Sequence, residues 1–184
     1  MAERICPFWR GYLLSNPIRK LVNHPQKILR PHIKEGMKVI DIGCAMGFFS
    51  LPIAKMIGSE GKVICIDIQE RMIKSLIKRA KKVDLLDRIE TRLSTASSFC
   101  LDDLDEEIDF ALAFYVVHEV SEPKVLFEQL YKVLKSQARL LMAEPKGHVS
   151  ITQFTETIQE AQEQGFKVID MPNIYFSHTV LLEK

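Results

Sequence analysis

The fold of this 184-residue chain is decided by the stretch Val39-Ile40-Asp41-Ile42-Gly43-Cys44-Ala45-Met46-Gly47-Phe48-Phe49-Ser50. Its first residues are mostly β-branched and predict a buried strand, which ends in a turn bracketed by Gly43 and Gly47. Apolar residues at helical spacing follow this turn: Phe48, Phe49, Leu51, Ile53, Ala54 and Ile57. A strand, a tight glycine turn and a helix together present backbone N–H groups to a nucleotide-like ligand.

The residues at the glycine positions of this turn argue against a dinucleotide as the ligand. A dinucleotide fingerprint has glycines at its first, third and sixth positions, and these positions here hold Gly43, Ala45 and Phe48. The Phe48 side chain would block the close approach of helix and pyrophosphate that the third glycine permits. NAD is therefore disfavoured, although an NAD or nucleotide-sugar enzyme of this sheet type stays as an alternative.

An acidic residue in the strand followed by Gly-x-Ala-x-Gly resembles motif I of the class I S-adenosylmethionine-dependent methyltransferases, which is usually written (Asp/Glu)-x-Gly-x-Gly-x-Gly. Asp41, Gly43 and Gly47 match the motif, and Ala45 stands at the middle glycine. The resemblance implies that S-adenosylmethionine is the cofactor and S-adenosylhomocysteine the product. It also implies that the cofactor lies against the turn, whose Cys44 has no chemical role in such enzymes.

Length and composition are those of one ordinary globular domain, with 47% hydrophobic and 27% charged residues. The net charge of +1 creates no field that would gather nucleic acid or membrane. The longest uninterrupted apolar run, Phe110 to Val117, has 8 residues and is too short to span a bilayer. The four cysteines show no C-x-x-C spacing, so we expect no metal site and a reducing, cytoplasmic location. The N-terminus lacks a secretion signal.

The N-terminal part of the chain differs from the rest. Residues 1–38 carry eight Lys/Arg against two Asp/Glu, and four prolines divide them into short pieces. One interpretation is a helix packed on the sheet edge with a solvated basic face. The other is a cap over the ligand site, because the methyltransferases that motif I resembles often place substrate-binding helices ahead of it; the first interpretation is preferred, and the two are compatible. We assign residues 1–35 to a helical cap segment and residues 36–184 to the S-adenosylmethionine-binding domain.

A second buried strand is predicted over Lys62–Asp67, and it ends in an acid 26 residues after Asp41. A carboxylate at this strand end can accept hydrogen bonds from the two ribose hydroxyls of a nucleoside. The alternative is a carboxylate that only caps the following helix, predicted over about Glu70 to Val83. We favour the ribose role for Asp67, with Ile68 beside the cofactor.

A third strand over Arg88–Leu93 precedes a polar loop. In the methyltransferase layout this loop flanks the adenine, so Ser94 and Thr95 are expected to contact the ring, although many relatives have an acid there. The acidic run over 102–107 is interpreted as a solvated linker, because it lacks the glycine-anchored pattern of a calcium loop.

A fourth strand over Ile108–Tyr115 leads into Val116-Val117-His118-Glu119-Val120. This segment resembles the corresponding part of small-molecule (type 11-like) methyltransferases, in which a strand-starting acid and a downstream histidine recur; Asp109 and His118 match them. Enzymes that methylate the amines of nucleic-acid bases carry Asn/Asp-Pro-Pro-Tyr/Phe here. This motif is missing, so base N-methylation is not expected.

The remaining segments complete the pattern. We expect a helix from Pro123, a strand over Arg139–Pro145 that Pro145 ends, a helix over Ile151–Gln164 that Gly165 ends, and strands over 166–169 and 177–182. The sequence thus predicts an α/β three-layer sandwich. Its seven-stranded, mostly parallel, Rossmann-like sheet has helices between the first five strands and before the sixth, and ends in an antiparallel hairpin.

Ligands of such sheets bind beyond the C-terminal strand ends. Methyl transfer needs a positioned acceptor and, for an oxygen or thiol acceptor, a base. The expected catalytic residues are His118 first and His148 second, each as base or as acceptor-orienting group; the alternative for His118 is a purely structural hydrogen bond. The expected cofactor and substrate contacts at these strand ends are Phe114 for the cofactor, and Tyr115, Glu119 and Glu144 for the acceptor. His178 is expected to be structural.

The leading hypothesis is therefore an S-adenosylmethionine-dependent methyltransferase that acts on a small molecule. A catalytically silent protein that binds S-adenosylmethionine or S-adenosylhomocysteine is the alternative from another class. The acceptor atom stays open, as does the choice between monomer and homodimer.

Overall fold

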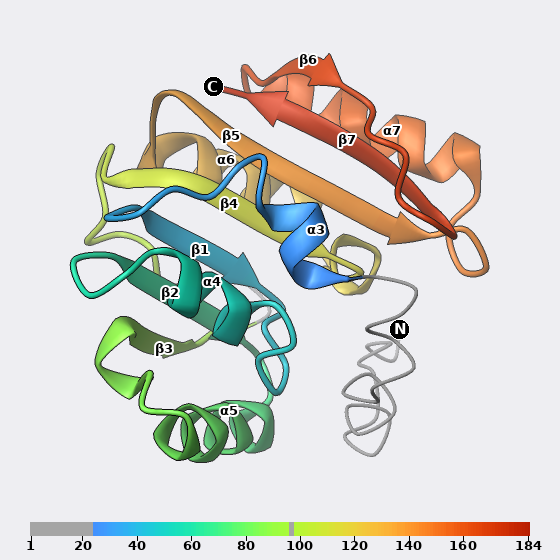
Figure 1. Cartoon of the computed structure of the whole chain (residues 1–184). Helices are drawn as coiled ribbons and strands as arrows, with labels where there is room; N and C mark the ends of the chain where they lie inside the picture. Colours follow the sequence, from blue (N-terminus) through green and yellow to red (C-terminus); the bar gives the residue numbers. More distant parts are fainter. Residues whose placement is uncertain (1–23, 96–97) are drawn as a thin grey trace.

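The strand β1 (Lys38–Ile42) lies inside a seven-stranded sheet (Figure 1). The computed structural model describes residues 24–95 and 98–184. The other strands are β2 (Lys62–Asp67), β3 (Ile89–Leu93), β4 (Ile108–Phe114), β5 (Leu134–Pro145), β6 (Lys167–Asp170) and β7 (Ser177–Glu183). Their order across the sheet is β3-β2-β1-β4-β5-β7-β6, so the chain reverses its direction of winding at β1, between β2 and β4.

The first five strands are parallel, and β7 runs antiparallel between β5 and β6. The predicted mostly parallel sheet with a final antiparallel hairpin is therefore confirmed. Because the parallel strands all end at one edge, the turn after β1, Asp67 and the segment after β4 come together there.

Helices cover both faces of the sheet, as Figure 1 shows, so the three-layer prediction is also confirmed. One face carries α3 (Pro25–Leu29), α4 (Ser50–Met56) and α5 (Glu70–Lys82), and the other carries α6 (Pro123–Val133) and α7 (Ile151–Glu163). Two short 3₁₀ helices, η1 (Leu86–Arg88) and η2 (Val117–Glu119), complete the described elements.

The prediction of a helix between β3 and β4 is wrong for the described residues of that connection. These residues, 94–95 and 98–107, contain no helix. Phe99, Leu101 and Leu104 are buried there and pack in the same core cluster as α6. The acidic residues between them favour turns over a helix interior. An irregular segment thus covers this part of the sheet.

One element boundary also differs from the predictions. β5 begins at Leu134, directly after α6, and its register against β4 shifts between Ile108 and Phe110. The strand ends at Pro145, as predicted, and Pro145 pairs in register with Ser177 of β7. The end of α7 is as predicted: Ser150 and Gln153 form a capping box at its start, and Gly165 follows its C-cap with φ +107°.

Part of the predicted cap packs on the sheet. Leu29 and Ile33 are buried in the cluster that includes α4, and the His32 ring stacks on Phe110 at 5.4 Å. Residues 24–35 are thus attached to the core of the domain. Residues 1–23 lie outside the described residues, so the division into a cap and a domain stays a prediction.

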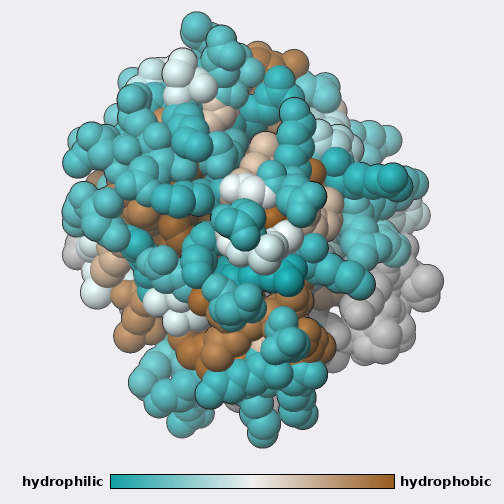
Figure 2. Space-filling model, turned by 60° about the vertical axis from the view of Figure 1, so that its left-hand side comes forward, coloured by the Kyte–Doolittle hydropathy of each residue, from teal (hydrophilic) through white to brown (hydrophobic). Residues whose placement is uncertain are grey.

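The described surface is mixed in character. Figure 2 shows a face on which hydrophilic side chains dominate and apolar patches lie between them. Within residues 24–95 and 98–184, no helix has the length and hydropathy that crossing a membrane requires.

Candidate functional site

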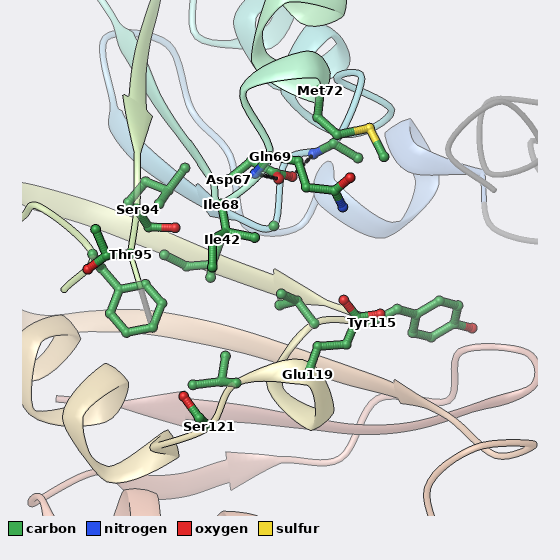
Figure 3. Close-up of a pocket in the computed structure, with 16 residues that line it drawn as sticks. Ile42, Asp67, Ile68, Gln69, Met72, Ser94, Thr95, Tyr115, Glu119 and Ser121 are labelled. Atoms are coloured by element: carbon green, nitrogen blue, oxygen red, sulfur yellow. Dashed lines mark hydrogen bonds between the residues drawn. The ribbon is translucent and has the colours of Figure 1, made fainter. Parts of the chain in front are cut away.

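A cavity opens at the C-terminal ends of β1, β2 and β4, where the topology predicts a ligand (Figure 3). Its empty space, with the open solvent at its mouth included, is about 920 Å³. Half of its lining was expected from the sequence: Gly43, Ala45, Asp67, Ile68, Ser94, Thr95, Tyr115 and Glu119. The other half was not: Ile42, Ile66, Gln69, Met72, Phe99, Val116, Val120 and Ser121.

The glycine turn needs its glycines for space and for backbone conformation. Gly43 has φ +68°, and a Cβ built there would lie 2.5 Å from Cγ2 of Val116. Gly47 has φ +81°, and its Cβ would lie 2.3 Å from Cδ1 of Leu76. Ala45 adopts φ +46° between them, a conformation that costs an alanine energy. The turn therefore passes close under α5 on one side and beside Val116 on the other.

Asp67 joins the ends of the first two strands. Its Oδ2 accepts a hydrogen bond from the backbone N–H of Ala45 at 2.9 Å, and its Oδ1 accepts one from Gln69 N–H at 2.8 Å. Burial raises the pKa of this carboxyl group, and the hydrogen bonds from the backbone N–H groups oppose that rise. The carboxylate thus supports the glycine turn and the start of α5, and it also lines the cavity.

Four predicted cofactor residues lie behind the cavity wall and not on it: Asp41, Cys44, Gly47 and Phe114. Asp41 is buried, and its Oδ2 accepts a hydrogen bond from Ser50 Oγ at 2.5 Å, which ties β1 to α4. The Cys44 thiol is buried, and its pKa is raised by burial and then by the neighbouring Cys65. Phe114 packs on Phe49 with 4.4 Å between ring centroids. These residues support the glycine turn from the side that faces away from the cavity.

His118, Glu144 and Glu119 form a chain of interactions after β4. The Glu144 side chain is buried; its Oε1 accepts hydrogen bonds from Val117 N–H at 2.8 Å and from His118 N–H at 3.3 Å. Its Oε2 is hydrogen-bonded to Nδ1 of His118. On the other side of the ring, Nε2 lies 3.8 Å from Oε1 of Glu119. Glu144 therefore fixes the backbone of η2 and the ring of His118 together.

The charge of His118 follows from these neighbours. Burial works against the charged imidazole, but the hydrogen bond to Glu144 and the charges of Glu144 and Glu119 together raise the pKa of His118 above its ordinary value. The ring of His148 stacks on that of His118, with centroids 6.3 Å apart. Neither histidine is among the described residues that line the cavity, whereas Glu119 is.

Tyr115 is held in a strained conformation, with φ +64°. Its hydroxyl is hydrogen-bonded to Ser177 Oγ at 2.6 Å. Figure 3 shows its ring pointing away from the other labelled residues. His178, expected to be structural, stacks on Phe154 of α7 at 5.5 Å.

The site has side chains that can hydrogen-bond to an adenosyl ligand. Figure 3 places Ser94 and Thr95 at one end of the cavity, Asp67 near its middle, and Tyr115 with Glu119 at the other end. The hydroxyl groups of Ser94 and Thr95 can hydrogen-bond to a purine ring, the strand-end carboxylate can accept hydrogen bonds from ribose hydroxyls, and the apolar lining can pack against ring faces. Among the described residues, no group of three or more His, Cys, Asp or Glu is placed to hold a metal ion.

A parallel sheet with a glycine turn after its first strand and a carboxylate after its second defines a Rossmann-like nucleoside-binding domain. The chain belongs to the methyltransferase domain family, whose family model matches residues 33–174. The resemblance of motif I to the class I S-adenosylmethionine-dependent methyltransferases is thereby confirmed at the level of the family, against the NAD and nucleotide-sugar alternative.

Three similar proteins bear on the chemistry. A methyltransferase from Aquifex aeolicus described as SAM-dependent has a crystal structure that superposes with a TM-score of 0.87 at 26% identity, over 97% of this chain and 99% of its own. The ubiquinone/menaquinone biosynthesis C-methyltransferase UbiE of Escherichia fergusonii is 26% identical over 112 residues, 61% of this chain and 44% of its own. The 23S rRNA (uracil(1939)-C(5))-methyltransferase RlmD of Acinetobacter baumannii is 33% identical over 54 residues, 29% of this chain and 12% of its own. The chain thus spans less than half the length of these two curated relatives.

Proposed function

We propose that this protein transfers the methyl group of S-adenosylmethionine to a small-molecule acceptor. The observation that carries the proposal is the cavity in which the Gly43–Ala45 turn and Asp67 face the segment after β4. Asp67 would hold the ribose hydroxyls, and Ser94, Thr95 and Ile68 would surround the adenine. The bound cofactor supplies an electrophilic methyl group on a sulfonium centre.

The residues of this chain act mainly by positioning. The apolar lining would pack against the cofactor, and the turn would orient it for in-line approach of the acceptor. Tyr115 and Glu119 stand at the end of the cavity where the methyl group would lie. His118 and Glu144 hold Glu119 and the backbone of η2 in place. The predicted base roles of His118 and His148 require these rings to reach the acceptor, and they remain predictions.

A small-molecule acceptor is supported by two observations. The name of UbiE describes C-methylation in quinone biosynthesis, and that relative matches 61% of this chain. RlmD, whose name describes an RNA substrate, matches only 29% of it. The acceptor atom is not part of the proposal. We also propose that residues 1–35 form a cap and that the protein is a monomer or a homodimer in the cytoplasm. We propose no nucleic-acid or membrane partner.

The test is a calorimetric titration of the purified chain with S-adenosylmethionine, S-adenosylhomocysteine and NAD. We expect micromolar binding of the first two, lost in Asp67→Ala and retained in Asp105→Ala, which removes an exposed carboxylate outside the cavity. Binding of NAD alone, or no binding to folded protein, would contradict the proposal. Cofactor binding without methyl transfer to any acceptor of an extract would favour the catalytically silent alternative.

A further inference from the structure

The charged side chains among the described lining residues of the cavity are both carboxylates. Among the described residues that line it, Asp67 and Glu119 are carboxylates and none is a lysine, arginine or histidine. Most of the other lining side chains are apolar. A ligand that brings positive charge into this space is therefore favoured over a neutral one of the same shape.

The two carboxylates differ in position and in task. Asp67 accepts hydrogen bonds from two backbone N–H groups and belongs to the ribose end of the site. Glu119 belongs to η2 on the opposite wall and has 27% of its side chain exposed. Figure 3 places it beside Tyr115, at the far end of the cavity from Ser94 and Thr95. Glu119 is thus the carboxylate that stands where a methionine tail and its sulfur would lie.

Glu119 belongs to an array of three ionisable side chains. Glu144 is hydrogen-bonded to Nδ1 of His118, and Nε2 of the same ring lies 3.8 Å from Glu119. Two carboxylates share one imidazole, so the formal charge of the three groups is −1 with His118 protonated and −2 with it neutral. Within these three groups the charge is therefore negative in either protonation state of His118, and Glu119 is the member that lines the cavity.

The cofactor and the product differ in charge at one atom. S-adenosylmethionine has a sulfonium, an ammonium and a carboxylate group, and its formal charge is +1. S-adenosylhomocysteine has a neutral thioether and a formal charge of zero. On the basis of the proposed function, we propose that Glu119 makes this site select the sulfonium cofactor over the thioether product. Methyl transfer would then remove the charge that Glu119 attracts, which promotes product release.

The size of the effect is set by one charge–charge contact in a half-exposed site. Such a contact gives a preference of about tenfold, which corresponds to about 1.4 kcal/mol. The Glu119→Gln substitution keeps the shape of the side chain and removes its charge. We expect it to weaken S-adenosylmethionine binding about tenfold and to leave S-adenosylhomocysteine binding within about twofold.

The experiment measures dissociation constants by calorimetry for the wild type, Glu119→Gln and the matched control Glu122→Gln. Glu122 is an exposed carboxylate three residues further on and does not line the cavity. The ligands are S-adenosylmethionine, S-adenosylhomocysteine and sinefungin. Sinefungin is an analogue of similar shape that has an amine-bearing carbon in place of the sulfonium. Because its amine is protonated at neutral pH, sinefungin should follow S-adenosylmethionine.

The outcomes separate the two proposals. Binding of all three ligands to the wild type supports the cofactor assignment whatever Glu119 does, and binding of none would overturn both proposals. A selective loss of the two cationic ligands in Glu119→Gln, not seen in Glu122→Gln, supports the role of Glu119. Equal changes for all three ligands, or no change, would overturn it. If Glu119→Gln is unfolded by circular dichroism, Glu119→Asp decides: it shortens the reach and should reduce the preference.

Discussion

Gly43 and Val116 meet with no room for a methyl group between them. A Cβ on the glycine would lie 2.5 Å from Cγ2 and 2.8 Å from Cβ of the valine. Both residues line the cavity, so this contact sets the distance between its two walls. The width of the site therefore depends on the absence of one side chain.

The first prediction concerns this contact. Gly43→Ala should lower the free energy of unfolding by about 2–5 kcal/mol, because a left-handed alanine costs about 1–2 kcal/mol and overpacking adds about 1–3 kcal/mol. Chemical denaturation would measure the loss. S-adenosylhomocysteine affinity should fall as well, since the walls must move apart.

Two other glycines separate the causes. Gly36 has φ +78° and nothing within 4 Å of a built Cβ, so Gly36→Ala should cost only the backbone strain of about 1–2 kcal/mol. Gly147 has neither a neighbour within 4 Å nor a left-handed φ, so Gly147→Ala should stay within about 0.5 kcal/mol of the wild type. An equal loss for Gly43→Ala and Gly36→Ala would show that the Val116 contact does not matter.

Ala45→Gly restores the middle glycine of the motif. Ala45 has φ +46°, where glycine is not strained, so we expect the substitution to raise the free energy of unfolding by about 0.5–1 kcal/mol. Cofactor affinity should hardly change, because the N–H of residue 45 still donates to Asp67. A loss of stability in urea titrations would mean that the alanine methyl group contributes packing that outweighs its strain.

Arg79 supports the glycine turn from α5. Its Nη1 donates a hydrogen bond to the carbonyl of Met46 at 2.6 Å, and burial lowers the pKa of the guanidinium group. Arg79→Met should lower the free energy of unfolding by about 1–2 kcal/mol and weaken cofactor binding, since the turn loses this support. Lys78→Met, on the exposed side of the same helix, is the control. Equal stability and affinity for the two variants would refute the supporting role.

The pair of His118 and Glu144 predicts a pH dependence. The folded-state pKa of His118 is raised above its ordinary value of 6.5, so the stability it contributes is complete below 6.5 and is lost as the pH rises through the raised value. Glu144→Gln removes the partner while burial still disfavours the charged ring. The pKa of His118 should then fall below 6.5, and this loss of stability at rising pH should disappear.

Imidazole NMR titration of the two proteins measures the pKa directly, and urea unfolding between about pH 5.5 and 8.5 measures its linkage to stability. Glu156→Gln, which removes an exposed carboxylate on α7, should behave as the wild type in both. An unchanged His118 pKa in Glu144→Gln would show that Glu144 is not the group that raises it.

Most of the fold could be predicted from local sequence patterns. The turn after β1, the strand-end Asp67 and the start of α6 at Pro123 are short-range features, and all three lie where they were predicted. The parallel direction of the first five strands followed as well, because a helix between two strands of a sheet brings the chain back to the same edge. The connection from β3 to β4 was not predictable in the same way. Its few buried side chains follow neither helical nor strand spacing.

The sequence by itself determined the family, because the motif of the turn is a short local pattern. It also determined that the ends of the parallel strands lie at one edge of the sheet, because each strand and each helix can be predicted from neighbouring residues. Only the tertiary structure decided on which side of η2 each acid and histidine would stand. Glu144 of β5 is buried against His118 across 26 residues of chain, and Glu119, the next residue after His118, lines the cavity. No periodicity records such a contact, because it arises from the packing of β5 beside β4.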